Sequence, residues 1–151
     1  MVYRLTNQAY KEMVAGCRRE YPLEACGLLA GRESALGEKH YPITNTDASS
    51  STYNMEPSQV LTAYKEIEAW GGEITAFYHS HTQSEAYPSP TDREKSLGGD
   101  ILYVIVSLKE SKPSVRAFHI SPENVQEVRI ALENTDREAV SGEVNDNERI
   151  K

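Results

Sequence analysis

The chain has 151 residues, of which 38% are hydrophobic and 26% are charged, a composition that fits one soluble globular domain with a real core. Its net charge of −7 argues against general nucleic-acid binding, which requires a basic surface. No apolar run approaches the roughly 20 residues of a membrane span, and the N-terminus lacks the layout of a signal peptide. Two cysteines are too few for a disulfide framework. We therefore expect a cytoplasmic protein.

The N-terminal part of the chain predicts one helix followed by two strands. Four apolar residues recur at intervals of four and predict an amphipathic helix over about Asn7–Glu20, with its cap at Thr6 or the residue after it. These residues are Leu5, Ala9, Met13 and Cys17. The apolar run Ala25–Ala30 predicts a buried strand, and residues 39–45 predict a second one. Pro42 places the second strand at a sheet edge or a bulge, because proline cannot donate a ladder hydrogen bond.

The middle of the chain predicts two helices and two strands. Pro57 stands in the first turn of a helix that ends at the glycine pair starting with Gly71. Ile74–His79 alternates in polarity and predicts a strand, and a short helix is expected at about Thr91–Leu97. The strongly apolar run Ile101–Leu108 predicts a central strand.

The C-terminal part predicts two more strands and a tail. Val115–Ile120 is expected to form a hairpin with the preceding strand, and Val125–Leu132 to form a last strand rather than a short helix. Residues 132–151 contain six acidic and three basic side chains and few apolar ones, which is typical of a disordered segment. The sequence therefore predicts a single α/β domain at residues 1–132, with a mixed β-sheet flanked by helices, and an acidic tail at residues 133–151.

Residues 79–92 carry the clearest chemical signal in the sequence. His79 and His81 stand two positions apart, so on a strand their side chains point to the same face. With Asp92 they make two imidazoles and one carboxylate, a sufficient ligand set for a catalytic zinc ion that keeps a water in its fourth position. The stretch therefore indicates hydrolysis by a metal-activated water, although a His-x-His pair alone is a weak motif.

The aspartate also fits a purely structural role. Ser89, Pro90 and Asp92 are spaced as a capping box, with serine at the cap, proline at the first helical position and an acid three residues after the cap. In that interpretation Asp92 binds backbone amides and complements the helix dipole. The two roles are compatible with one backbone, because Ser89 can cap the helix while Asp92 faces a metal.

A hydrolytic site also needs a general base near the bound water. Glu85 is close in sequence but stands in a loop without evident support. Glu24 directly precedes the predicted strand Ala25–Ala30, where burial would raise its pKa toward the value that a base needs at neutral pH. A single glutamate before a strand is otherwise most simply a surface residue.

The residues together resemble the motif of the JAMM (MPN+) metalloprotease family, His-x-His-x7-Ser-x2-Asp. His79-Ser80-His81 is followed after seven residues by Ser89 and after two more by Asp92, and Glu24 is similar to the glutamate that the family places upstream. The resemblance in layout runs from the first predicted helix to about Ile120. His40 and His119 fall outside the motif, and we expect surface or packing roles for them.

The resemblance implies a zinc ion and a role for each motif residue. His79, His81 and Asp92 would bind Zn2+. Glu24 would take a proton from the zinc-bound water and later give it to the leaving amine. Ser89 would hydrogen-bond the water or the oxyanion of the tetrahedral intermediate. Ser80 would face away from the metal.

The resemblance also implies a fold. The sequence itself excludes one related class of zinc enzymes. The expected layout is MPN-like, an arrangement similar to that of the cytidine deaminases. The His-x-Glu and Pro-Cys-x-x-Cys elements of those zinc enzymes do not occur in this sequence, so a deaminase activity is excluded.

Chain length suggests which branch of the family this sequence is similar to. It resembles the compact, stand-alone prokaryotic members, which are associated with small ubiquitin-like sulfur-carrier proteins ending in Gly-Gly. The resemblance implies a zinc-dependent peptidase or isopeptidase that acts at the carrier's C-terminus, one such activity being the release of cysteine. The loops Thr46–Asn54 and Thr82–Tyr87 are the candidates for lining the groove that takes the tail.

A catalytically silent MPN-type binding module is the alternative from a different functional class. Such modules typically lose metal ligands or the glutamate, whereas all five motif positions are filled here. The sequence therefore favours an enzyme.

Overall fold

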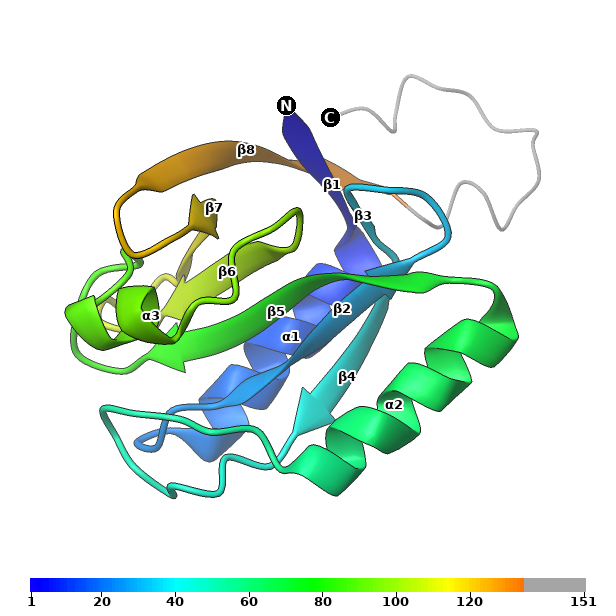
Figure 1. Cartoon of the computed structure of the whole chain (residues 1–151). Coiled ribbons are helices and arrows are strands. Elements are labelled where there is room, and N and C mark those ends of the chain that lie inside the picture. Colours follow the sequence, from blue (N-terminus) through cyan, green and yellow to red (C-terminus); the bar gives the residue numbers. More distant parts are fainter. Residues whose placement is uncertain (135–151) are drawn as a thin grey trace.

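An eight-stranded mixed β-sheet organises residues 1–134, the part of the chain that the computed structural model describes (Figure 1). In chain order the elements are β1 (Val2–Thr6), α1 (Asn7–Glu20), β2 (Cys26–Gly31), β3 (Leu36–Gly37), β4 (Lys39–Ile43), α2 (Pro57–Trp70), β5 (Glu73–His81), α3 (Pro90–Lys95), β6 (Leu102–Ser107), β7 (Ser114–Ile120) and β8 (Val125–Glu133). The strand order is β3-β1-β8-β7-β6-β5-β2-β4. β5 is parallel to β6, β1 is parallel to β3 and β8, and the other neighbours are antiparallel, so the predicted mixed-sheet α/β fold is confirmed.

Alternating side chains of β5 divide the core into two faces. Tyr78 packs into the apolar cluster beneath α1, whereas Phe77 packs against the cluster that contains Ile67 of α2. Side chains alternate across a strand, so His79 and His81 lie on the same face as Phe77. Both histidines are buried at the C-terminal end of β5.

The two long helices begin and end where the sequence predicts. The Thr6 hydroxyl caps α1 by accepting the amide of Ala9 at 3.1 Å. Pro57 opens α2, and Gly71 ends it in the left-handed conformation, with φ of 90°. No helix among residues 1–134 is long and apolar enough to cross a membrane.

Two strands, β1 and β3, were not predicted. Leu5 has helical spacing to Ala9, but it lies in β1, because Thr6 caps α1 and ends the strand there. Tyr3 and Leu5 alternate inward and are both fully buried, which is the period of a strand. β3 has two residues, too few to give any periodic signal.

Element ends near the histidines also differ from the prediction. β5 continues two residues beyond the predicted end at His79 and therefore includes His81, since β6 pairs with it as far as Ser107. α3 covers Pro90–Lys95 instead of Thr91–Leu97.

The remaining strand predictions are confirmed. β4 carries Pro42 and is an edge strand, β6 lies inside the sheet between β5 and β7, and Val125–Glu133 is a strand. β8 therefore includes Glu133, the first residue of the segment predicted as an acidic tail. Residues 135–151 of that segment lie outside the described residues.

We predict that residues 135–151 can be removed without loss of folding. A chain of residues 1–134 keeps β8, whose residues from Arg129 to Glu133 pair with β1, so it should melt cooperatively near the temperature of the full chain. Thermal unfolding followed by circular dichroism measures this. Residues 1–124 serve as the control and should lose cooperative melting, because β1 loses its long partner. A non-cooperative melt of residues 1–134 would contradict the predicted domain boundary.

Candidate metal centre and general base

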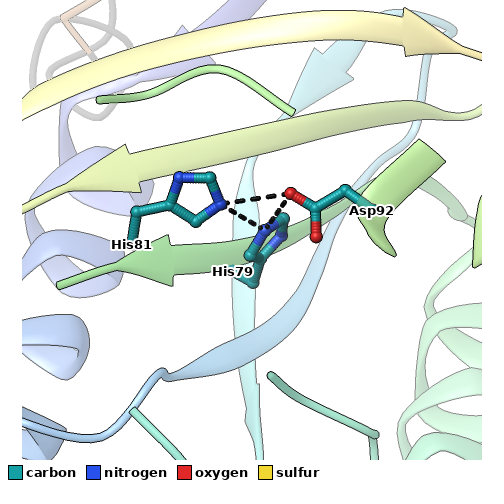
Figure 2. A group of neighbouring side chains, drawn as sticks. All are labelled: His79, His81 and Asp92. Atoms are coloured by element: carbon teal, nitrogen blue, oxygen red, sulfur yellow. Dashed lines mark hydrogen bonds and ion pairs between the residues drawn. The ribbon is translucent and has the colours of Figure 1, made fainter. Parts of the chain in front are cut away.

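Three side chains direct one atom each toward a common point. Nε2 of His79 lies 3.2 Å from Nε2 of His81, and both nitrogens lie 3.1 Å from Oδ2 of Asp92 (Figure 2). Ligand atoms on a tetrahedral zinc ion with bonds of about 2.0–2.1 Å are separated by roughly 3.3 Å. The triangle therefore has the dimensions of one face of a zinc coordination shell.

The position of Asp92 is compatible with both of the roles that the sequence left open. The Ser89 hydroxyl oxygen accepts the Asp92 amide at 3.0 Å, and Asp92 Oδ2 accepts the Ser89 amide at 2.9 Å, which completes the capping box of α3. The same Oδ2 atom is the one that faces both histidines. The cap thus fixes the carboxylate at the cluster, and the Ser89 hydroxyl keeps its proton as a donor.

A hydrogen bond of His81 determines which ring nitrogen carries the proton. The other nitrogen then has the lone pair that faces the cluster. Nδ1 lies 2.8 Å from the carbonyl oxygen of Glu85, which can only accept, so Nδ1 carries the proton. In the neutral ring Nε2 then has a free lone pair. This is the tautomer that a metal-binding histidine requires, with its other nitrogen donating to a backbone carbonyl.

Burial and mutual contact set the charges of the cluster. Burial lowers the pKa of His79 and favours its neutral form. Burial would also lower the pKa of His81, but the hydrogen bond with Asp92 and the Glu85 carbonyl raise it overall. Burial opposes ionisation of Asp92, yet hydrogen bonds from the two histidines and the Ser89 amide hold its pKa well below the usual range. The carboxylate is therefore an anion, as a zinc ligand must be.

The register between β2 and β5 brings Glu24 to the metal ligands. Cys26 pairs with His79, so two residues further along this antiparallel pair Glu24 comes opposite His81. Glu24 is 6% exposed, and burial raises its pKa to about 7, with the His81 charge lowering it and the Asp92 charge raising it further. Glu24 is therefore a buried carboxylate with the pKa of a general base, and not a surface residue.

Backbone contacts hold Glu24 in place from both sides. Its amide donates to the carbonyl of Ser49 at 2.8 Å, and its carbonyl accepts from Nδ2 of Asn45 at 3.0 Å. Glu85, by contrast, has an exposed side chain, and only its backbone carbonyl contacts the cluster. The structure thus supports Glu24 as the better placed of the two candidate bases.

Ser80 points away from the metal ligands, as expected, and connects them to the base. Its hydroxyl accepts the amide of Ala25 at 2.8 Å, and its own amide donates to the carbonyl of Ala25 at 3.0 Å. The residue between the two histidines is therefore bonded to the residue after Glu24. This pair of bonds fixes the distance between the ligand strand and the candidate base.

The loop that joins β4 to α2, residues 44–56, contributes contacts that the sequence did not indicate. Tyr53 stacks on the ring of His79 with centroids 4.4 Å apart and planes inclined by 22°. Thr82, which follows β5, donates its hydroxyl proton to the carbonyl of Ser50 at 3.2 Å. Tyr53 is the one aromatic residue in the polar part of this loop, and that was the only available signal.

His40 and His119 do not join the cluster. Nε2 of His40 lies 2.6 Å from the hydroxyl of Tyr78, on the α1 side of the sheet. His119 is a half-buried residue of β7 that borders a cavity with Met1 and Leu102. Among the described residues, neither histidine belongs to the group of His79, His81 and Asp92.

Comparisons with known proteins agree with this geometry. Residues 6–121 match the family described as prokaryotic homologs of the JAB domain. The chain is 39% identical over 110 residues to the CysO-cysteine peptidase of Mycobacterium tuberculosis, covering 72% of this chain and 75% of that protein. It is 37% identical over 123 residues to a probable TtuB-protein conjugate cleaving protease of Thermus thermophilus, covering 81% and 77%. The solution structure of a Desulfitobacterium hafniense protein superposes with a TM-score of 0.81 at 36% identity, over 89% of this chain and 94% of that one.

We predict that Glu24→Gln stabilises the zinc-free protein in a pH-dependent way. The folded-state pKa of Glu24 is about 7 against an ordinary value of 4.5, so ionisation costs stability as pH rises through this window. Glutamine avoids that cost. Wild type and variant should unfold at similar temperatures near pH 4.5, and above pH 7 the variant should be more stable by on the order of 1 kcal/mol.

Thermal melts of chelator-treated protein across this pH range measure the difference. A difference that is the same at both ends of the range would show that Glu24 is not buried as described.

Proposed function

Because the chain belongs to the family of prokaryotic JAB-domain proteins, we propose that it is a zinc-dependent peptidase or isopeptidase acting at the C-terminus of a small ubiquitin-like sulfur-carrier protein. The observation that carries the proposal is the triangle of His79, His81 and Asp92 ligand atoms beside a buried glutamate. A metal site alone fits a structural role. A metal site with a base whose pKa is near neutral fits hydrolysis.

The proposed ligands of the zinc ion are Nε2 of His79, Nε2 of His81 and Oδ2 of Asp92. Three protein ligands leave a fourth position for water or substrate, which is the arrangement of catalytic zinc sites. When bound, zinc lowers the pKa of a coordinated water from about 15.7 to about 7 and polarises a carbonyl. The alternating faces of β5 and the cap of α3 hold these ligands before any metal arrives.

Glu24 and Ser89 are the proposed catalytic residues. Glu24 accepts a proton from the attacking water and delivers it to the leaving amine, which its pKa of about 7 allows in both directions. The Ser89 hydroxyl oxygen already accepts the Asp92 amide, so its proton remains available for the substrate oxygen that gains negative charge. One such donor is typically worth about 3–4 kcal/mol of transition-state stabilisation.

The proposed substrate follows from the relatives and from the space around the site. One relative is named for a CysO-cysteine substrate and another for TtuB-protein conjugates, which agrees with the expected carrier proteins ending in Gly-Gly. The proposed groove lies between the 44–56 loop and residues 82–87. A cavity of about 590 Å3 also borders Glu24, but it is lined by Gly16, Arg19 and Tyr78 on the α1 side of the sheet and by none of the proposed metal ligands, so it is not part of the proposed groove.

We also infer a cytoplasmic location. Cys17 and Cys26 are both buried free thiols, which supports a reducing compartment. The alternative function, a silent binding module, is disfavoured because no motif position has lost its functional side chain.

Asp92→Asn should weaken zinc binding by roughly a hundred-fold or more, because it removes the one anionic ligand. Asparagine can still accept the Ser89 amide, so the cap of α3 and the fold should survive. Zinc affinity is measured by competition with a chromophoric chelator. Asp100→Asn, an exposed change outside the site, is the matched control and should bind like wild type. Wild-type protein that binds no zinc at micromolar concentration would overturn the proposed function.

Glu24→Gln should keep zinc and lose turnover by about 10²–10⁴-fold, since the base acts on water and not on the metal. The assay incubates the enzyme with a sulfur-carrier protein extended beyond Gly-Gly by cysteine and weighs the product by mass spectrometry. Glu123→Gln, in an exposed turn, controls for the loss of one acidic side chain and should retain full activity. Equal rates for Glu24→Gln and wild type would assign the base to another residue.

A further inference from the structure

The two histidine ligands are held in place by different means. Nδ1 of His81 donates to the Glu85 carbonyl, the usual support for a metal-binding imidazole. Nδ1 of His79 is buried and has no hydrogen-bond partner among the described residues. A fully buried ring without such a bond needs another contact to fix its orientation.

Tyr53 supplies that contact. Its ring lies 4.4 Å from the ring of His79 at an angle of 22°, within the range of offset stacking. Tyr53 is itself half-buried and packs against the apolar cluster under α2, together with Met55 and Val60. The stacked face therefore belongs to a packed side chain and not to a mobile surface residue.

The backbone around Tyr53 is bonded to the helix that carries Asp92. Nζ of Lys95, the last residue of α3, lies 3.5 Å from the Tyr53 carbonyl and 3.4 Å from Oδ1 of Asn54. Tyr53 thus contacts one metal ligand directly. Through Lys95, the backbone of Tyr53 is also connected to α3, the helix that carries the second proposed ligand, Asp92.

Asn45 connects the same loop to the candidate base. Its side-chain amide donates to the carbonyls of Glu24 and Thr52, and its side-chain oxygen accepts the amides of Asp47 and Asn54. All four hydrogen-bonding positions of this side chain are used. The 44–56 loop therefore connects the base, one histidine and α3.

We propose that Tyr53 is a positioning residue, which orients His79 for the metal by ring stacking in place of a hydrogen bond, and that it couples zinc binding to the order of the 44–56 loop. The inference rests on the proposed zinc site. Coupling between binding events is reciprocal, so a substrate tail that orders this loop tightens zinc binding, and zinc in turn favours the substrate.

Substitutions of Tyr53 separate ring stacking from the other properties of the side chain. Tyr53→Phe keeps the ring and should bind zinc within about two-fold of wild type, whereas Tyr53→Leu removes it and should bind about ten-fold more weakly. Val60→Ala is the matched control, because it weakens the same apolar cluster without touching a ligand. It should lower the unfolding temperature of the zinc-free protein and leave zinc affinity unchanged.

A second measurement reads the coupling without any assay of activity. Amide hydrogen exchange of residues 45–54 should slow when zinc is added to wild type or Tyr53→Phe, and should not change in Tyr53→Leu. Wild-type zinc affinity in Tyr53→Leu, or equal losses in Tyr53→Leu and Tyr53→Phe, would overturn the role of the ring while leaving the proposed function intact. A wild type that binds no zinc would remove the proposed function and this inference together.

Discussion

The antiparallel register between β2 and β5 is the constraint on which the site depends. Because Cys26 stands opposite His79, the residue that ends up opposite His81 is Glu24, and the two elements meet at one end of the sheet. A shift of one residue would turn either the histidines or the glutamate to the face under α1. The register is fixed by burial on both sides, since every residue of β2 is buried, and by the double contact of Ser80 with Ala25.

Several ionisable groups lie close together at the candidate metal centre, and their contacts with one another set the protonation state of each. Contacts with the two histidine rings and the Ser89 amide hold the pKa of Asp92 well below its usual range, whereas burial raises the pKa of Glu24 to about 7. Two carboxylates that interact electrostatically thereby obtain different protonation behaviour from their surroundings. One is suited to hold a cation and the other to move a proton. For the chemistry, the difference between the pKa values of these two carboxylates matters more than the presence of two acids.

The sequence predicted the parts of the fold that depend on local signals. Thr6, Pro57 and Gly71 marked helix ends because each satisfies or removes specific backbone groups. The metal-ligand candidates were found because their spacing along the chain is fixed. The strand of Tyr3 and Leu5 was missed because a competing helical spacing begins at Leu5, and β3 was missed because two residues are too few to be periodic. Tyr53 and Asn45 could not be identified as supports, because a loop residue's partner depends on how the loop crosses the folded site.

Two demands, the observed cap and the proposed metal ligation, limit which side chains can stand at the position of Asp92. Zinc accepts histidine, cysteine or carboxylate ligands, so coordination chemistry alone leaves three choices. The first turn of α3 leaves fewer of these choices, because the ligand atom must also accept the Ser89 amide. A neutral imidazole or a thiolate at the third helical position makes that hydrogen bond poorly. A longer acid would keep the charge but move the oxygen away from the point where His79 and His81 meet. Helix capping, a property of the backbone, therefore selects the chemistry of the ligand.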